Sequence, residues 1–294
     1  MSTQQKTEAT YSGKTAVVTG GASGVGRCLC ELFARSGMNV IMADIELAAL
    51  EAAGAALQSE GLNVAWVQAD VTSPDSMANL ERQSRETFGN IHILCNNAGV
   101  GIKEAQRRIW TLTPKDWEWG FSVNVMGIAN GIRAFVPGML AHGEPGHVVN
   151  TSSTNGGLHS MPTTPIYSST KAAVTSMTEV LHYQFLMDGA ALQAHVLFPG
   201  PHLVNTNILS SMRNRPADLR DNDEPVAYTS MADLAKASGI ANMKLTEPEE
   251  VAETCLAGIR AGQFWILPAS THNDKQLSQR TESILRRENP ALQR

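Results

Sequence analysis

The sequence predicts an α/β fold, a doubly wound parallel sheet of seven strands flanked by helices. Short runs rich in β-branched and other apolar residues alternate with longer amphipathic stretches, which is the order of βαβ units. The short runs are almost continuously apolar, as expected of parallel strands buried on both faces. The chain has 294 residues, of which 43% are hydrophobic and 17% are charged, so it can build a sizeable apolar core. We therefore predict a single domain over residues 1–294.

The elements follow from these runs in order. The seven predicted strands are Thr15–Thr19, Val40–Ala43, Val64–Ala69, Ile91–Cys95, His147–Thr151, Gln193–Phe198 and Phe264–Leu267. Six predicted helices fill the gaps: Gly24–Ser36, Leu47–Glu60, Pro74–Phe88, Pro114–Ala141, Pro165–Met187 and Pro248–Ala261. Four of these helices begin at proline, which suits a first helical turn.

Two segments do not follow this rhythm. Residues 203–246, after the sixth strand, are much longer than an ordinary connection and mix apolar with charged residues. They predict a lid of short helices over an apolar cleft, and the alternative is a solvent-exposed insertion. Residues 269–294 form a charged tail in which Leu277, Ile284 and Leu285 can share one helix face, so the tail is expected to serve packing or oligomer contact.

Composition excludes several classes of function. A net charge of −5 provides no basic surface for nucleic acid. No run approaches the roughly 18 apolar residues of a membrane span, and the first twelve residues lack the apolar core of an export signal. Metal-ligand spacing is missing among the four cysteines, so we expect no metal and reduced thiols in a cytoplasmic protein.

A glycine-rich turn follows the first strand and opens a helix. Small residues there let the backbone approach a pyrophosphate, which the helix N-terminus attracts. The alternative is a tight strand–helix turn without a ligand. The residues expected at the phosphates are Gly20, Ser23, Gly24, Val25 and Gly26.

Asp44 ends the second strand, eighteen residues after Gly26. A carboxylate in this place can accept hydrogen bonds from the hydroxyls of an adenosine ribose. It also repels a 2′-phosphate, and the turn and the residues just after Asp44 offer no arginine or lysine to offset that repulsion. The sequence therefore favours NAD over NADP.

Polar or small residues also follow the third and fourth strands. Asp70 and Val71 suggest a contact with adenine, although Asp70 equally suits a cap for the helix at Pro74. Asn97, Ala98 and Gly99 lie where the chain must bend past a cofactor.

Tyr167 and Lys171 stand four residues apart on a predicted helix, which places them on one face. A free phenol has a pKa near 10, and a neighbouring ammonium can lower the pKa enough for proton exchange near neutrality. Spacing alone is also compatible with an ordinary exposed helix face. Ser152 and Ser153 end the fifth strand, and Asn124 lies within a helix, where asparagine is unfavourable without a specific partner.

Taken in order, these motifs resemble those of short-chain dehydrogenase/reductases of the non-extended type. The resemblance covers residues 14–267 and implies a Rossmann-type fold. The family's TGxxxGxG is Thr19–Gly26, its NNAG is Asn96–Gly99, its helix asparagine is Asn124, its serine is Ser153, its YxxxK is Tyr167 with Lys171, and its Pro-Gly is Pro199-Gly200. Two departures exist: the serine-to-tyrosine spacing is one residue longer than expected, which keeps Ser152 and Thr154 as alternatives, and the threonine after Pro-Gly comes late, at Thr206.

The resemblance implies roles for four catalytic residues. Tyr167 takes the proton of a secondary alcohol as hydride leaves for the nicotinamide, or returns it when a ketone is reduced. Ser153 holds the substrate oxygen. Lys171 lowers the pKa of Tyr167 and binds the nicotinamide ribose, and Asn124 fixes a water that links Lys171 to solvent. The family also implies a homodimer or homotetramer formed through the helices Pro114–Ala141 and Pro165–Met187.

A narrower similarity, in Gly146–Asn150, Pro165–Tyr167, Pro199–Pro201 and Asn214–Pro216, is to bacterial Cα-dehydrogenases of lignin-derived β-aryl ethers. The expected substrate is a bulky, neutral, aromatic secondary alcohol or its ketone, and the alternatives are a hydroxysteroid or terpenoid alcohol and a non-catalytic NAD-binding regulator. For His159 and His202, polar lining is favoured over additional catalysis. The residues expected to line the substrate cleft are Gly156, Leu158, His159, Met161, His202, Leu203 and Met212.

Overall fold

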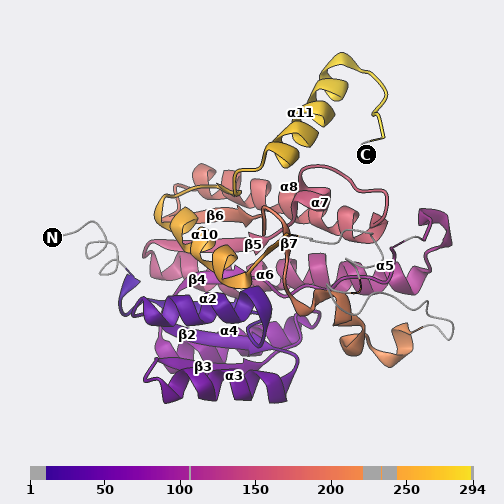
Figure 1. Ribbon diagram of the computed structural model, residues 1–294. Helices are drawn as coiled ribbons and strands as arrows, with labels where there is room; N and C mark the ends of the chain where they lie inside the picture. The colour runs from indigo at the N-terminus through magenta and orange to yellow at the C-terminus, as the bar shows by residue number, and fades with distance from the viewer. Residues whose placement is uncertain (1–10, 106, 221–232, 234–243, 293–294) are drawn as a thin grey trace.

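The computed structural model describes residues 11–105, 107–220, 233 and 244–292. In these residues seven parallel strands form one sheet in the order β3-β2-β1-β4-β5-β6-β9 (Figure 1), which confirms the predicted fold class. The strands are β1 (Thr15–Thr19), β2 (Asn39–Asp44), β3 (Val64–Gln68), β4 (Ile91–Asn96), β5 (Gly146–Thr151), β6 (Leu192–Leu197) and β9 (Trp265–Ile266). Most of their side chains are buried, as the nearly continuous apolar runs require.

Helices cover both faces of the sheet (Figure 1). One face packs against α2 (Gly24–Arg35), α3 (Leu47–Ser59) and α10 (Pro248–Arg260), through side chains such as Leu29, Leu50 and Leu256. The other face packs against α4 (Pro74–Phe88), α6 (Gly127–His142) and α8 (Pro165–Met187), through side chains such as Met77, Phe135 and Phe185. The two apolar layers fix the sheet between the helices.

The predicted helix Pro114–Ala141 is interrupted in the structure. It begins as α5 (Pro114–Phe121), continues through a π-helical turn, η2 (Ser122–Met126), and resumes as α6. π-helical turns of this kind are frequent at functional sites. Asn124 lies in this turn, fully buried.

The strand order reverses direction between β1 and β4. Ligands of open α/β sheets bind beyond the carboxyl ends of the strands at such a point. Thr19, at the end of β1, accepts hydrogen bonds at its hydroxyl from the backbone N–H groups of Asn97 (3.0 Å) and Ala98 (3.1 Å), just after β4. These bonds join the glycine-rich turn to the loop after β4.

The described part of the predicted lid contains η3 (Asn207–Asn214) and η4 (Ala217–Leu219). Its two ends are joined by a small parallel pair, β7 (Leu203–Val204) with β8 (Leu245–Thr246), which the sequence did not indicate. Residues 221–232 and 234–243 of the predicted lid lie outside the described residues.

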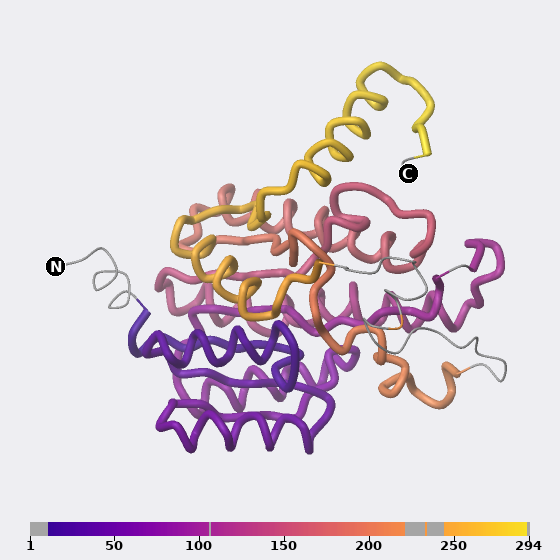
Figure 2. Tube along the Cα trace, in the orientation of Figure 1, coloured from indigo at the N-terminus to yellow at the C-terminus, as the bar shows by residue number. Residues whose placement is uncertain are grey.

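Two short helices and the tail complete the described chain. The short helices are η1 (Ile109–Thr111) and α7 (Thr154–Gly157). The tail forms α11 (Thr271–Arg286), which projects from the body of the molecule (Figure 2). It contacts the rest of the molecule through Leu277, which packs against a small apolar cluster, and through Arg280, whose guanidinium donates to the Leu158 carbonyl (3.2 Å). Ile284 and Leu285, expected to share a helix face with Leu277 for packing or oligomer contact, are exposed.

No helix in the described ranges is both long and apolar enough to cross a membrane. The same residues hold no cluster of three or more histidine, cysteine or carboxylate side chains suited to a metal ion. All four cysteines are free thiols, and Cys30, Cys95 and Cys255 are buried.

Candidate active site

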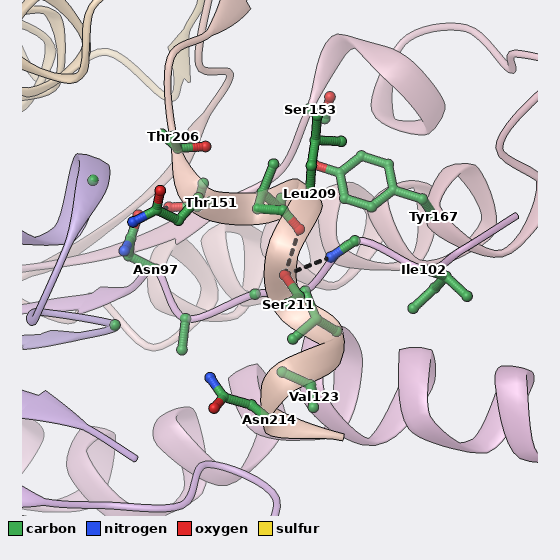
Figure 3. Close-up of a pocket in the computed structure, with 18 of the residues that line it drawn as sticks. Asn97, Ile102, Val123, Thr151, Ser153, Tyr167, Thr206, Leu209, Ser211 and Asn214 are labelled. Atoms are coloured by element: carbon green, nitrogen blue, oxygen red, sulfur yellow. Dashed lines mark hydrogen bonds between the residues drawn. The ribbon is translucent and has the colours of Figure 1, made fainter. Parts of the chain in front are cut away.

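A cavity of about 1110 Å³ opens at the carboxyl ends of the strands. It runs from the glycine-rich turn and Asp44 to Ser153, Tyr167 and Lys171, and the lid helix η3 forms part of its wall (Figure 3). The volume exceeds the roughly 300–1,000 Å³ usual for one small ligand. It is large enough for a dinucleotide beside a second molecule.

The glycine-rich turn requires its glycines for different reasons. Gly20 and Gly24, which line the cavity, have φ of 70° and 52°, the left-handed region that favours glycine. Gly26 does not line the cavity, contrary to its predicted place at the phosphates. A Cβ on Gly26 would lie 2.0 Å from the Gly20 carbonyl oxygen, so this glycine lets α2 pack against the turn.

The first turn of α2 faces the cavity with its backbone N–H groups available. Ser23, the N-cap, makes no side-chain capping bond, and no acidic residue lies in the first turn. Ser23 and Val25 both line the cavity. A helix N-terminus in this state attracts an anionic group.

The Asp44 carboxylate lies at the same end of the cavity. It accepts hydrogen bonds from the backbone N–H groups of Ala22 and Glu46, each at 3.1 Å, and burial raises its pKa above the usual range of an aspartate. Asp70 and Val71 line the wall after β3. Ser73, not Asp70, caps α4, because its hydroxyl accepts from the Ser76 N–H (3.2 Å).

The loop after β4 contributes Asn97, Ala98 and Gly99 to the wall. The Asn97 side-chain amide donates to the Thr19 carbonyl (3.1 Å), which holds this loop against the glycine-rich turn. A Cβ on Gly99 would approach the side-chain oxygen of Asn124 to 3.3 Å and Nζ of Lys171 to 3.7 Å. The missing side chain thus keeps the loop close to both polar groups.

Tyr167 lies two residues after the start of α8, with Ser153 beside it (Figure 3). The Ser153 side chain hydrogen-bonds the phenol, which lowers the Tyr167 pKa, but burial outweighs this bond and raises the pKa to about 12. Ser152 points elsewhere: its hydroxyl donates to the Lys171 carbonyl (2.9 Å). Thr154 lines the cavity as well. Of the three candidates, the structure places Ser153 against the tyrosine.

Lys171 is 3% exposed, and its ammonium donates to the Thr151 carbonyl (2.8 Å). Burial lowers its pKa to about 8. The ammonium lies 5.5 Å from the centre of the Tyr167 ring. Burial is the largest influence on the pKa of both groups, and the predicted lowering of the tyrosine pKa by Lys171 stays a prediction.

Asn124 is near the site but does not line the cavity. Its side-chain oxygen accepts from the Val100 N–H (2.8 Å), and its amide donates to the Val100 carbonyl (3.1 Å) and to the Thr170 hydroxyl (3.2 Å). These bonds connect the loop after β4 with α8. The structure thus gives Asn124 a structural partner on each side, while its predicted part in a water relay stays a prediction.

The remaining predicted residues divide into two groups. Met161, His202, Leu203, Pro199 and Thr206 line the cavity. Gly156, Leu158, His159, Gly200 and Met212 do not, which corrects their expected places. Leu158 packs into the cluster with Val196 and Phe198, and His159 is buried, 6% exposed. Both residues interact with α11, which the sequence did not indicate. Arg280 bonds the Leu158 carbonyl, and the His159 pKa is lowered by burial and also by the charges of His272 and Arg280.

Several lining residues were missed. Ile208, Leu209 and Ser211 of η3 form one wall, and the Ser211 hydroxyl accepts from the Gly101 N–H (3.2 Å; Figure 3). Further along the lid, Arg213 forms an ion pair with Glu46 (2.6 Å), two residues after Asp44. The lid therefore reaches the Asp44 end of the cavity.

Glu104 is another missed residue of the wall. Its side chain is buried, and its two carboxylate oxygens accept from the backbone N–H groups of Ile166 (2.6 Å) and Tyr167 (2.9 Å). Its only trace in the sequence is an isolated acid five residues after Gly99.

Comparison with known proteins agrees with this geometry. A crystal structure of a short chain dehydrogenase/reductase from Burkholderia phymatum in complex with NAD superposes with a TM-score of 0.87, at 35% identity, over 97% of this chain and 98% of that one. The Cα-dehydrogenase of Sphingobium sp. (strain NBRC 103272 / SYK-6) is 30% identical over 88% of this chain and 81% of its own length. The fluoren-9-ol dehydrogenase of Terrabacter sp. (strain DBF63) is 34% identical over 64% of this chain and 56% of its own length.

The family description "short chain dehydrogenase" matches residues 14–216. This range contains the glycine-rich turn, Asp44, Asn124 and the Ser153–Tyr167–Lys171 group. The chain belongs to the short-chain dehydrogenase/reductase family, whose members are oxidoreductases.

Proposed function

We propose that this protein is an NAD-dependent oxidoreductase that interconverts a bulky, neutral secondary alcohol and its ketone. The observation that carries the proposal is the Ser153–Tyr167 hydrogen bond, set with Lys171 in one cavity whose other end is Asp44 and the glycine-rich turn. A proton-exchanging phenol and a dinucleotide site in one cavity are what alcohol oxidation by hydride transfer requires.

The residues fit NAD at the Asp44 end. The uncapped first turn of α2 supplies donors for a pyrophosphate, and Gly20 leaves no room for a side chain, because its Cβ would lie 3.0 Å from Ala98 Cα. The Asp44 carboxylate would hold the ribose hydroxyls and disfavour a 2′-phosphate. NAD, when bound, accepts the hydride of the alcohol. The Burkholderia phymatum relative was crystallised in complex with NAD.

The residues of this chain handle the proton. The Ser153 hydroxyl would bind the substrate oxygen and direct it to the phenol. The phenolate of Tyr167 would accept the proton of the alcohol. In the reverse direction the phenol would donate a proton to the ketone oxygen. Because burial raises the Tyr167 pKa and lowers that of Lys171, phenolate and ammonium form most readily as a pair, in which each charge offsets the desolvation of the other.

The apolar walls of the cavity support the substrate class. Its apolar lining includes Ile102, Trp119, Met161, Ile208 and Leu209. Glu104 adds an acid there, so an anionic substrate would be repelled. The named substrates of the two relatives above, fluoren-9-ol and a Cα alcohol, support a bulky or aromatic alcohol.

The experiment is a turnover assay by absorbance of reduced nicotinamide, with NAD or NADP and a panel of secondary alcohols. The panel contains aryl-glycerol ethers, benzylic and fluorenyl alcohols, hydroxysteroids and terpenols. We expect oxidation of a bulky aromatic member with NAD, and loss of at least about a thousandfold in kcat for Tyr167→Phe, whose NAD affinity stays within about twofold.

Two results would contradict the proposal. Equal turnover by Tyr167→Phe would remove the tyrosine from the chemistry. Binding of NAD without turnover of any alcohol in the panel would overturn the substrate class.

A further inference from the structure

Glu104 is a buried titratable group that the proposed chemistry does not use. It lies in the loop between β4 and η1, 1% exposed, and yet lines the cavity that holds Tyr167. A carboxylate in such a place must be matched by donors, because an unpaired buried charge is strongly destabilising. The structure supplies them from a segment 62 residues away in the chain.

The donors are the first N–H groups of α8. Glu104 Oε2 accepts from Ile166 N (2.6 Å) and Oε1 from Tyr167 N (2.9 Å). Thr164, the N-cap residue of α8, makes no side-chain capping bond. Glu104 is therefore the N-terminal cap of α8, although it lies outside the helix. One of the two backbone N–H groups that it accepts from belongs to Tyr167.

The same carboxylate adds a negative charge to the wall of the cavity that also holds the phenol. That charge raises the Tyr167 pKa, in the direction opposite to the Ser153 hydrogen bond. The pKa of Glu104 is raised to about 7, mainly by burial and also by the charge of Asp116, while the backbone bonds from Tyr167 and Ile166 and the charge of Arg107 oppose the rise. Asp116 is itself paired with Arg107 and with the lid residue Arg215, at 2.9 Å each.

We propose that Glu104 is a positioning residue for the tyrosine. Its carboxylate fixes the first turn of α8 through two backbone bonds, and it adds a negative charge to the wall of the cavity that holds the phenol. This inference rests on the proposed function of Tyr167 as the proton acceptor. It assigns to Glu104 two separable effects, one of geometry and one of charge.

The test compares pH profiles of alcohol oxidation for the wild type, Glu104→Gln and Glu104→Asp, with folding checked by circular dichroism. Glu104→Gln removes the charge and keeps the length of the side chain, although its amide nitrogen cannot accept one of the two backbone bonds. We expect the profile to move by roughly 0.5–1 unit to lower pH, because the phenol then ionises more easily. Glu104→Asp keeps the charge on a shorter arm, so its profile should keep the wild-type midpoint while kcat falls on the order of tenfold.

Glu179→Gln is the matched control, since it makes the same chemical change on α8, remote from its first turn, and should leave both midpoint and kcat unchanged. If Glu104→Gln only lowers the rate uniformly, with an unmoved midpoint, Glu104 is a structural cap and the inference is overturned.

A second measurement separates this inference from the proposed function. Ultraviolet absorbance titration follows ionisation of tyrosine and needs no substrate. The Tyr167 component is obtained by subtracting the titration of the same protein carrying Tyr167→Phe. With Glu104→Gln the Tyr167 component should appear at lower pH than in the wild type, and an unchanged component refutes the charge effect. A wild type that turns over no alcohol refutes the proposed function alone, and the titration then decides the role of Glu104.

Discussion

Lys171 carries a buried charge whose cost depends on pH. Its folded-state pKa of about 8 lies below the 10.5 that is usual for a lysine. Between these two pH values the unfolded chain binds the proton and the folded chain does not. Stability must therefore rise with pH through this window, because the folded state no longer has to bury an ammonium.

We expect Lys171→Met to remove this dependence. From pH 8 to about 9.5 the free energy of unfolding of the wild type should gain roughly 2 kcal/mol relative to the variant, at 1.36 kcal/mol per pKa unit. Urea unfolding at a series of pH values measures the difference. Lys275→Met, at an exposed position on α11, is the control and should track the wild type. A constant difference between the wild type and Lys171→Met would show that the ammonium is not destabilised by burial.

Local sequence patterns predict where single residues lie, but they do not predict the pKa values of those residues. The spacing of Tyr167 and Lys171 places them on one helix face, and the structure brings both into the cavity. Spacing could not give their pKa values, because these depend on burial by segments distant in sequence. The same limit applies to Leu158 and His159, whose interactions with α11 no local pattern indicates.

At the scale of elements, the turn between β1 and α2 works through backbone packing. Gly26 lies inside α2, and its missing side chain lets the helix contact the Gly20 carbonyl. A methyl group there cannot be accommodated without moving the turn that lines the cavity.

We expect Gly26→Ala to lower the free energy of unfolding by about 3 kcal/mol and to weaken NAD binding at least about tenfold. Thermal unfolding and calorimetric titration with NAD measure these effects. The same substitution at Gly138 in α6 is the control, because a Cβ there meets only the Glu81 carboxylate, at 3.4 Å. It should be neutral or stabilise by up to about 1 kcal/mol. Equal NAD affinity for the wild type and Gly26→Ala would exclude a steric role for this glycine.

The contacts of the predicted lid cannot be derived from the order of the elements along the chain. Its length predicts a covering segment, and the described part does form a wall through Ile208 and Leu209. That it also reaches Glu46 through Arg213 was not predictable, since these residues come from distant parts of the chain. The Arg213–Glu46 ion pair brings an arginine to the region of Asp44. The residues next to Asp44 in the sequence do not reveal it.

The whole molecule presents an apolar strip on α8. Val180, Tyr183, Leu186 and Met187 are between 50% and 83% exposed. They recur at spacings of three and four, so they share one side of the helix. Exposed apolar surface of this kind marks an interface, which supports the expected homodimer or homotetramer.

We expect light scattering to give a dimer or tetramer for the wild type and a smaller species for Leu186→Glu, because a charge buried in an apolar interface is costly. Leu47→Glu, at an exposed apolar position on α3, is the control and should leave the mass unchanged. An unaltered mass for Leu186→Glu would place the interface, if one forms, elsewhere.

The fold class, the order of the strands and helices along the chain, and the positions of the glycine-rich turn, Asp44, Tyr167 and Lys171 are all predictable from the sequence. These depend on local periodicity and on residue types that only certain backbone geometries accept. The tertiary structure alone decided which serine meets the phenol, how burial shifts the tyrosine and lysine pKa values, and that Glu104 caps α8. Such contacts join segments far apart in the chain, and their energies arise from desolvation, which exists only once the chain has packed.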